Sequence, residues 1–101
     1  MTDNAQVLLT LVIPPKLEHD VIDYLLSIGE TGFLSFVGSG HGGSGRGMSI
    51  VEQVAGRQKR VIFQIHTAHQ RALTIRSELA AAFAGAELHY WIAPVLESGS
   101  I

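Results

Sequence analysis

The chain has 101 residues, a formal net charge of −2 and 47% hydrophobic residues, enough for one compact domain with a modest core. The slightly acidic balance argues against nucleic acid as the main partner, because neutralising phosphates requires a basic surface. The absence of cysteine excludes disulfides and thiolate metal sites. No stretch reads as a signal peptide or a membrane span, so we expect a cytoplasmic protein without membrane insertion.

The first third of the chain predicts a strand, a helix and a second strand. Residues 5–13 are apolar at almost every position, which is typical of a strand covered on both faces. A Pro-Pro pair ends this strand, and its second proline suits the first turn of a helix over 16–28. Gly29 is placed to stop that helix, and a short strand is expected over 32–37.

The second half predicts a strand, a helix and a final strand. Residues 60–66 alternate between two faces, as a strand does. The sequence T-A-H-Q at 67–70 matches a capping box and predicts the start of an alanine-rich helix. Gly85 is expected to stop this helix, and the last strand is expected over 87–92.

The resulting order, β-α-β-β-α-β, predicts an α+β ferredoxin-like sandwich. With right-handed crossovers, two helices cover one face of a four-stranded antiparallel sheet. The other face is left without helices and is too apolar for water, so we expect a second copy of the chain to cover it. The residues expected on this face are Leu8, Thr10, Val12, Ile62, Gln64 and Trp91, or the residues that alternate with them.

A glycine-rich stretch interrupts this regular pattern in the middle of the chain. Six glycines fall between Gly38 and Gly47, where ordering the backbone costs entropy and no apolar side chain can offset it by burial. We therefore expect a long flexible loop over 38–59 that becomes ordered on a ligand or partner. A hairpin tip without a role is the alternative. Within the loop, S-I-V-E at 49–52 matches a capping box and predicts a short helix.

Cations are concentrated in and beside this loop. Glu52 is the single acid among them, although the chain as a whole is acidic. This local excess suits a phosphate or carboxylate ligand or an acidic partner surface, and ordinary solubilising charge is the alternative. The cationic residues are Arg46, Arg57, Lys59 and Arg60.

Histidines provide the candidate metal ligands. His41 is the one side chain in the glycine half that can bind a metal at neutral pH, and a divalent transition metal is a candidate cofactor. One imidazole does not make a site, so His89, His66 or Glu52 of the same or a neighbouring chain would have to contribute. His66 and Gln70 also lie where a strand meets a helix N-terminus, a place that favours anions. No catalytic set stands out, so we do not expect an enzyme.

Three segments carry a resemblance to a known family. They are G-F-L-S-F-V-G-S-G-H-G at 32–42, V-E-Q-V-A-G-R-Q-K-R at 51–60 and H-Y-W-I-A-P-V-L-E-S-G at 89–99. Together with the element order, they resemble the PII-like superfamily, which includes PII and CutA-type proteins. They are most similar to an uncharacterised PII-like family often encoded beside heavy-metal efflux pumps of the resistance-nodulation-division type.

The resemblance implies a single domain over 1–101 that assembles as a homotrimer. In such proteins ligands lie in clefts between subunits, under the T-loop that corresponds to 38–59, and the turn at 66–70 and the tail at 94–99 line the same cleft. The turn lacks the glycine-rich basic sequence that nucleotide-binding PII proteins use for phosphates.

The implied function is that of a regulator that senses a small molecule or metal ion. Its T-loop would dock a partner, with an efflux-pump component as the candidate. Two alternatives stay open: a metal-binding protein without a signalling role, and an enzyme with sites between subunits.

Overall fold

The computed structural model describes residues 5–41 and 57–101. Four strands form one antiparallel sheet in the order β2-β3-β1-β4, which confirms the predicted ferredoxin-like α+β fold. The helices in the described part of the chain lack the length and the apolar character that a membrane span requires. The elements are β1 (Gln6–Ile13), a 3₁₀ turn η1 (Pro15–Leu17), α1 (Glu18–Ser27), β2 (Leu34–His41), β3 (Arg57–Ala68), α3 (His69–Ala82) and β4 (His89–Pro94).

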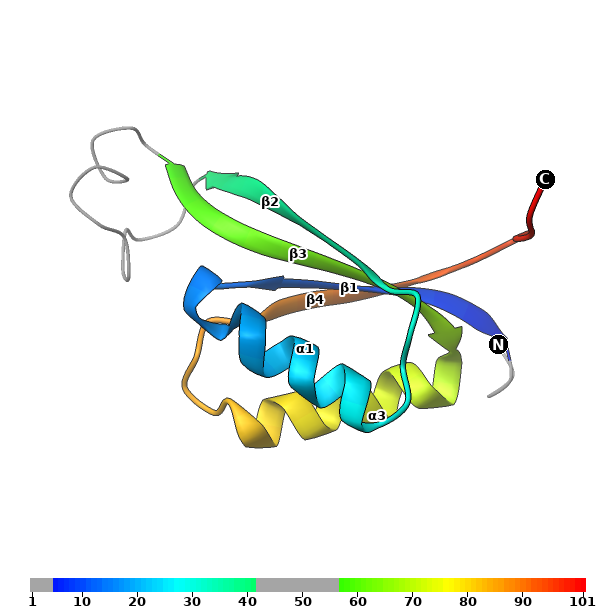
Figure 1. Cartoon of the computed structure of the whole chain (residues 1–101), viewed down its shortest axis with the longest axis horizontal. Helices are drawn as coiled ribbons and strands as arrows, with labels where there is room; N and C mark the ends of the chain where they lie inside the picture. Colours follow the sequence, from blue (N-terminus) through cyan, green and yellow to red (C-terminus); the bar gives the residue numbers. More distant parts are fainter. Residues whose placement is uncertain (1–4, 42–56) are drawn as a thin grey trace.

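Helices α1 and α3 lie on the same face of the sheet, and the core fills the space between the two layers (Figure 1). Alternate residues of β1 and β3 point into this space, as the sequence pattern predicted. Each fully buried aliphatic side chain contributes about 1.5–3 kcal/mol of transfer free energy, so this layer is the main source of stability. The core residues are Val7, Leu9, Leu11, Ile13, Val21, Leu25, Val61, Phe63, Ile65, Ala72, Ile75 and Leu79.

The end of α1 is fixed by a Schellman motif, which confirms the predicted stop at Gly29. Gly29 has φ +84°, a conformation that residues with a Cβ rarely adopt. Its N–H donates to the carbonyl of Leu26 at 3.1 Å, and the N–H of Glu30 donates to the carbonyl of Leu25 at 3.0 Å. The turn therefore satisfies two of the last carbonyls of the helix and fixes the backbone at Glu30.

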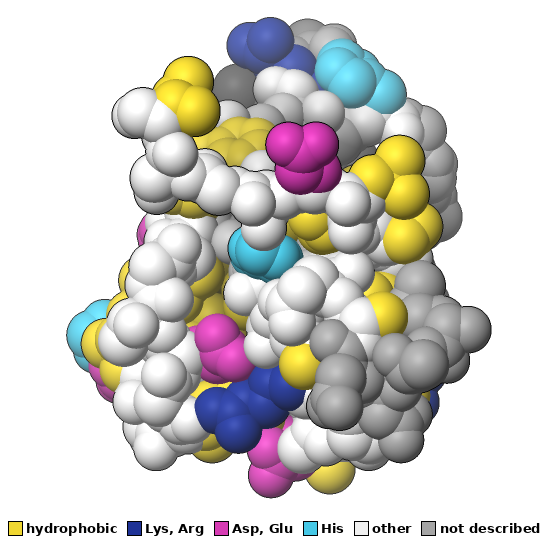
Figure 2. Space-filling model, turned by 90° about the vertical axis from the view of Figure 1, so that its right-hand side faces the viewer, with side chains coloured by type: hydrophobic (Ala, Val, Ile, Leu, Met, Phe, Trp, Pro, Cys, Tyr) yellow, Lys and Arg dark blue, Asp and Glu magenta, His cyan; other side chains and the backbone are white. Residues whose placement is uncertain are grey.

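The predicted capping box at 67–70 is wrong. Thr67 belongs to β3, and the N-cap of α3 is Ala68, which has no side-chain cap. The Thr67 hydroxyl instead donates to Glu30 Oε1 at 3.0 Å, and Arg71 Nε donates to the same oxygen at 3.2 Å. A partner distant in sequence thus satisfies the threonine. Figure 2 shows basic and acidic side chains adjoining in the lower half of its view.

The β2–β3 hairpin is longer than the sequence indicated and extends beyond the helices (Figure 1). β2 continues to His41 and β3 begins at Arg57, so both strands enter the expected loop. Glycine suits this part of β2 because a Cβ at Gly38 would lie 2.6 Å from Ile62 Cδ1. Gly38 therefore makes room for the Ile62 side chain of β3, a packing role that the sequence did not reveal.

The remaining part of the expected loop, residues 42–56, lies outside the described residues, together with the capping box expected at 49–52.

Candidate functional site

The sheet face opposite the helices carries a set of apolar side chains. We call it the open face. Strand register places its residues in rows, because directly paired residues of antiparallel strands point to the same side. Leu34, Phe36 and Trp91 are 63%, 49% and 54% exposed. Large apolar side chains grouped on one exposed face mark an interaction surface. One row contains Leu34, Gln64, Thr10 and Trp91, and the next contains Phe36, Ile62, Val12 and His89.

Thr10 occupies the middle of the first row. It is 2% exposed although no described helix covers this side of the sheet. Its Oγ1 is buried and has no hydrogen-bond partner among residues 5–41 and 57–101. A buried hydroxyl without a partner costs about 1–3 kcal/mol. The centre of the open face therefore combines exposed aromatic and aliphatic side chains with an unsatisfied polar atom.

Arg60, a predicted ligand-binding residue, is held in an ion pair on the same face. The residue is 7% exposed, and its Nη2 lies 2.6 Å from Gln58 Oε1 and 3.3 Å from Glu87 Oε2. Gly40 lies beside the arginine stem, where a Cβ would be 3.5 Å from Arg60 Cγ, an ordinary van der Waals distance. Sequence reasoning missed Glu87, which is 27 residues away and carries no local signal.

The other predicted ligands do not converge within one chain. Arg57 and Lys59 pair with His41 and Ser39 in the β2–β3 ladder, on the side opposite to Arg60. His66 lies on the open face opposite Leu8. Gln70 lies in the first turn of α3 and is exposed. The predicted ligands Arg46 and Glu52 lie outside the described residues.

The two predicted metal ligands are also separated in one chain. His41 is at the end of edge strand β2, and His89 is at the start of edge strand β4. His89 pairs with Val12 on the open face, whereas His41 follows the opposite alternation. Over the described part of the chain, no group of three His, Asp or Glu residues could hold a metal ion. A site using both histidines would have to combine different chains.

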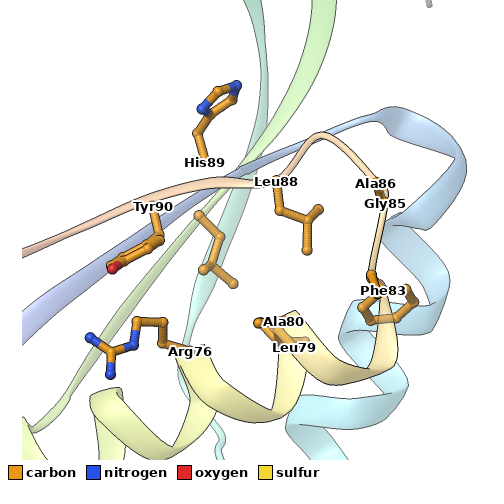
Figure 3. Close-up of a pocket in the computed structure, with 11 residues that line it drawn as sticks. Arg76, Leu79, Ala80, Phe83, Gly85, Ala86, Leu88, His89 and Tyr90 are labelled. Atoms are coloured by element: carbon orange, nitrogen blue, oxygen red, sulfur yellow. The ribbon is translucent and has the colours of Figure 1, made fainter.

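A pocket of about 240 Å³ lies on the helix side of β4. Figure 3 shows it between the second half of α3, the turn after that helix and the start of β4. Leu88 and Tyr90 point into the space, whereas the His89 ring points away from it. Arg76 lies at its edge, with Cζ 5.9 Å from the centre of the Tyr90 ring. Sequence reasoning missed this pocket, because its walls come together only when β4 lies beside α3.

Solved structures share the fold, among them the following three. A DUF3240 family protein from Shewanella baltica OS155 is 20% identical, with a TM-score of 0.76 and coverage of 100% of this chain and 99% of that one. CPII, a nitrogen regulatory PII-like protein from Thiomonas intermedia K12 bound to ADP, AMP and bicarbonate, is 11% identical, with a TM-score of 0.72 and coverage of 95% and 96%. A protein from Thermus thermophilus, provisionally assigned as a PII-like signalling protein, is 18% identical, with a TM-score of 0.64 and coverage of 89% and 86%.

None of the curated proteins is similar enough to this chain to count as a match. The solved structures confirm the predicted PII-like fold. A family model described as "Protein of unknown function (DUF3240)" matches residues 3–101, almost the whole sequence. The chain therefore belongs to the DUF3240 family, and its fold is similar to that of PII-like proteins.

Proposed function

We propose that this protein is a PII-like regulator that forms a homotrimer through its open face and senses a small molecule or a metal ion between subunits. The observation that carries the proposal is the open face itself. Three of its large apolar side chains, Leu34, Phe36 and Trp91, are each about half exposed or more in the single chain. Covering this surface with copies of the same chain removes it from water and gives an assembly with closed point-group symmetry.

Thr10 supports the same assignment. A hydroxyl in the middle of an apolar face needs an acceptor or donor, and none of the described residues supplies one. A neighbouring subunit that covers the open face brings new polar groups to this position. The similarity in fold to a nitrogen regulatory PII-like protein bound to ADP, AMP and bicarbonate supports a regulatory role.

The ligand site of this proposal lies where subunits meet, because the described candidates are dispersed in one chain. Since β2 and β4 are the edge strands of the described sheet, the proposed ring sets the β2 edge of one subunit against the β4 edge of the next. This arrangement would combine His41 with His89 for a divalent transition metal. An anionic ligand would use cations such as Arg57 and Lys59, at the end of the β2–β3 hairpin where β3 begins. The proposed anion-binding set is Arg46, Arg57, Lys59, Arg60, His66 and Gln70, and Glu52 is a further metal-ligand candidate.

The segment between β2 and β3 is the proposed partner-binding T-loop, and its residues 42–56 lie outside the described part of the chain. The proposed partner is a component of a heavy-metal efflux pump, as the family resemblance implies, with the regulator acting from the cytoplasm.

Two measurements test this proposal. Analytical ultracentrifugation at micromolar concentration should give about three chain masses, and a stable monomer would refute the assembly and the site between subunits. Thermal shift with zinc, copper, nickel, ATP and ADP should identify the ligand, because a ligand that binds only the native state raises the melting temperature. A metal shift lost in both His41→Ala and His89→Ala supports the metal branch. A nucleotide shift lost in Arg57→Gln supports the anion branch.

A further inference from the structure

The pocket beside β4 has the composition of a small-molecule site. Its floor and walls are apolar side chains, among them Leu79, Phe83 and Leu88. Small residues on α3 and in the following turn, including Ala80 and Gly85, leave the space unfilled. A hollow of this kind forfeits dispersion contacts that larger side chains would supply. Its volume of about 240 Å³ lies just below the range of about 300–1,000 Å³ for drug-sized ligands, so a compact ligand fits.

Arg76 gives this apolar pocket one charged group. No salt bridge of Arg76 occurs among residues 5–41 and 57–101, and no acid stands three or four positions away along α3. Figure 3 shows its side chain extending toward Tyr90, and the cation lies 5.9 Å from that ring. The contact holds the guanidinium at the mouth of the pocket. A guanidinium that lacks a carboxylate partner can still donate two parallel hydrogen bonds to one.

We propose that this pocket binds a small monocarboxylate with an apolar body, such as an arylalkanoate or a short fatty acid. The apolar part occupies the space between Leu79, Phe83 and Leu88, and the carboxylate pairs with Arg76 at the mouth. Charge complementarity selects this class, because a neutral apolar molecule leaves the cation unpaired and a polyanion does not match the apolar walls.

This site is built from one chain and lies on the helix side of the sheet, away from the open face. The inference therefore does not rest on the proposed assembly. A monomer that binds the carboxylate would refute the homotrimer but support the carboxylate site. A homotrimer that does not bind carboxylates would refute the carboxylate site but support the assembly.

The test is a titration with 3-phenylpropionate, followed by backbone amide chemical shifts in two-dimensional NMR. Saturable shifts are expected at Ala80, Gly85 and Leu88, which line the pocket. The neutral analogue 3-phenylpropanamide has almost the same shape and should bind at least about tenfold more weakly, because it cannot form the charged pair.

Matched variants locate the charge that is responsible. Arg76→Gln should weaken 3-phenylpropionate binding at least about tenfold, and Arg76→Lys should retain part of the affinity. Lys16→Gln removes the same charge from the exposed η1 turn and should leave affinity unchanged. Ala80→Leu fills the pocket and should abolish the saturable shifts. If that variant does not fold, the comparison of Arg76→Gln with Lys16→Gln still decides.

Three results would overturn the inference. The first is equal binding of the carboxylate and the amide. The second is equal affinity of Arg76→Gln and Lys16→Gln. The third is a set of shifts confined to the open face, around Thr10 and Trp91, with none in the pocket.

Discussion

Replacing Trp91 with alanine tests whether the open face holds the subunits together. Trp91 is 54% exposed in the single chain, and its register with Thr10 places it on the open face, as predicted. A tryptophan presents up to about 250 Å², so covering its exposed half removes about 135 Å² from water. At about 25 cal/mol per Å² this amounts to about 3 kcal/mol per subunit, an upper value because some area stays exposed at an interface.

A homotrimer contains three copies of Trp91, so the loss of assembly free energy is counted three times. About 9 kcal/mol in total corresponds to a factor of about 10⁶ in the dissociation constant of a trimer. The concentration of half-assembly depends on the square root of that constant, so it should rise by up to about 10³-fold. Sedimentation velocity from nanomolar to micromolar concentration measures this midpoint directly.

The control for this experiment is Leu26→Ala. Leu26 is 53% exposed, almost the same fraction as Trp91, but it lies on α1 rather than on the open face. Its replacement should leave the midpoint of assembly unchanged. If the two variants shift the midpoint equally, or if neither shifts it, the reasoning that assigns the interface to the open face is wrong.

Three further predictions concern the fold. Glu30→Ala removes the shared acceptor of Thr67 and Arg71 and should lower the free energy of unfolding by about 2 kcal/mol in urea denaturation, whereas exposed Glu97→Ala should not. Gly29→Ala should cost about 1 kcal/mol because of φ +84°, and Gly99→Ala, equally free of close neighbours, should be neutral; equal effects would contradict the strain argument. Burial of the Tyr24 hydroxyl is the main cause that raises its pKa, and the hydrogen bond to Glu78 and the negative charge of Glu78 raise it further. The folded state therefore keeps the Tyr24 proton at a pH where the unfolded chain loses it. Stability should therefore fall as pH rises above about 10, and it should fall less in Tyr24→Phe, as denaturation at pH 8 and pH 11 would show.

The fold could be predicted from the sequence because its signals are local. Alternation along 60–66 and apolar density along 5–13 each appear within a few residues, and Gly29 acts through its own backbone. The same local reading was wrong where a residue finds a distant partner. Thr67 matched a cap pattern, yet its hydroxyl is bonded to Glu30, 37 residues earlier in the chain.

The candidate site was harder to predict from the sequence, because its contacts join residues that are distant along the chain. Sequence reasoning grouped Arg57, Lys59 and Arg60 because they are neighbours, but strand alternation sends Arg60 to the other face, where Glu87 pairs with it. The glycine at position 38 suggested a loop, whereas it makes room for Ile62 across the hairpin. Neither contact has a signal within its own segment.

The strand β4 connects the two surfaces of this protein. Trp91 points to the open face and its neighbour Tyr90 points to the pocket, because successive residues of a strand face opposite sides. Within the sheet, β4 is an edge strand whose described partner is β1. A shift of one residue in that pairing would exchange the two sets of side chains, removing Trp91 from the proposed interface and Tyr90 from Arg76. The register between β1 and β4 is therefore a shared requirement of the assembly surface and the carboxylate pocket, although neither surface depends on the other for its chemistry.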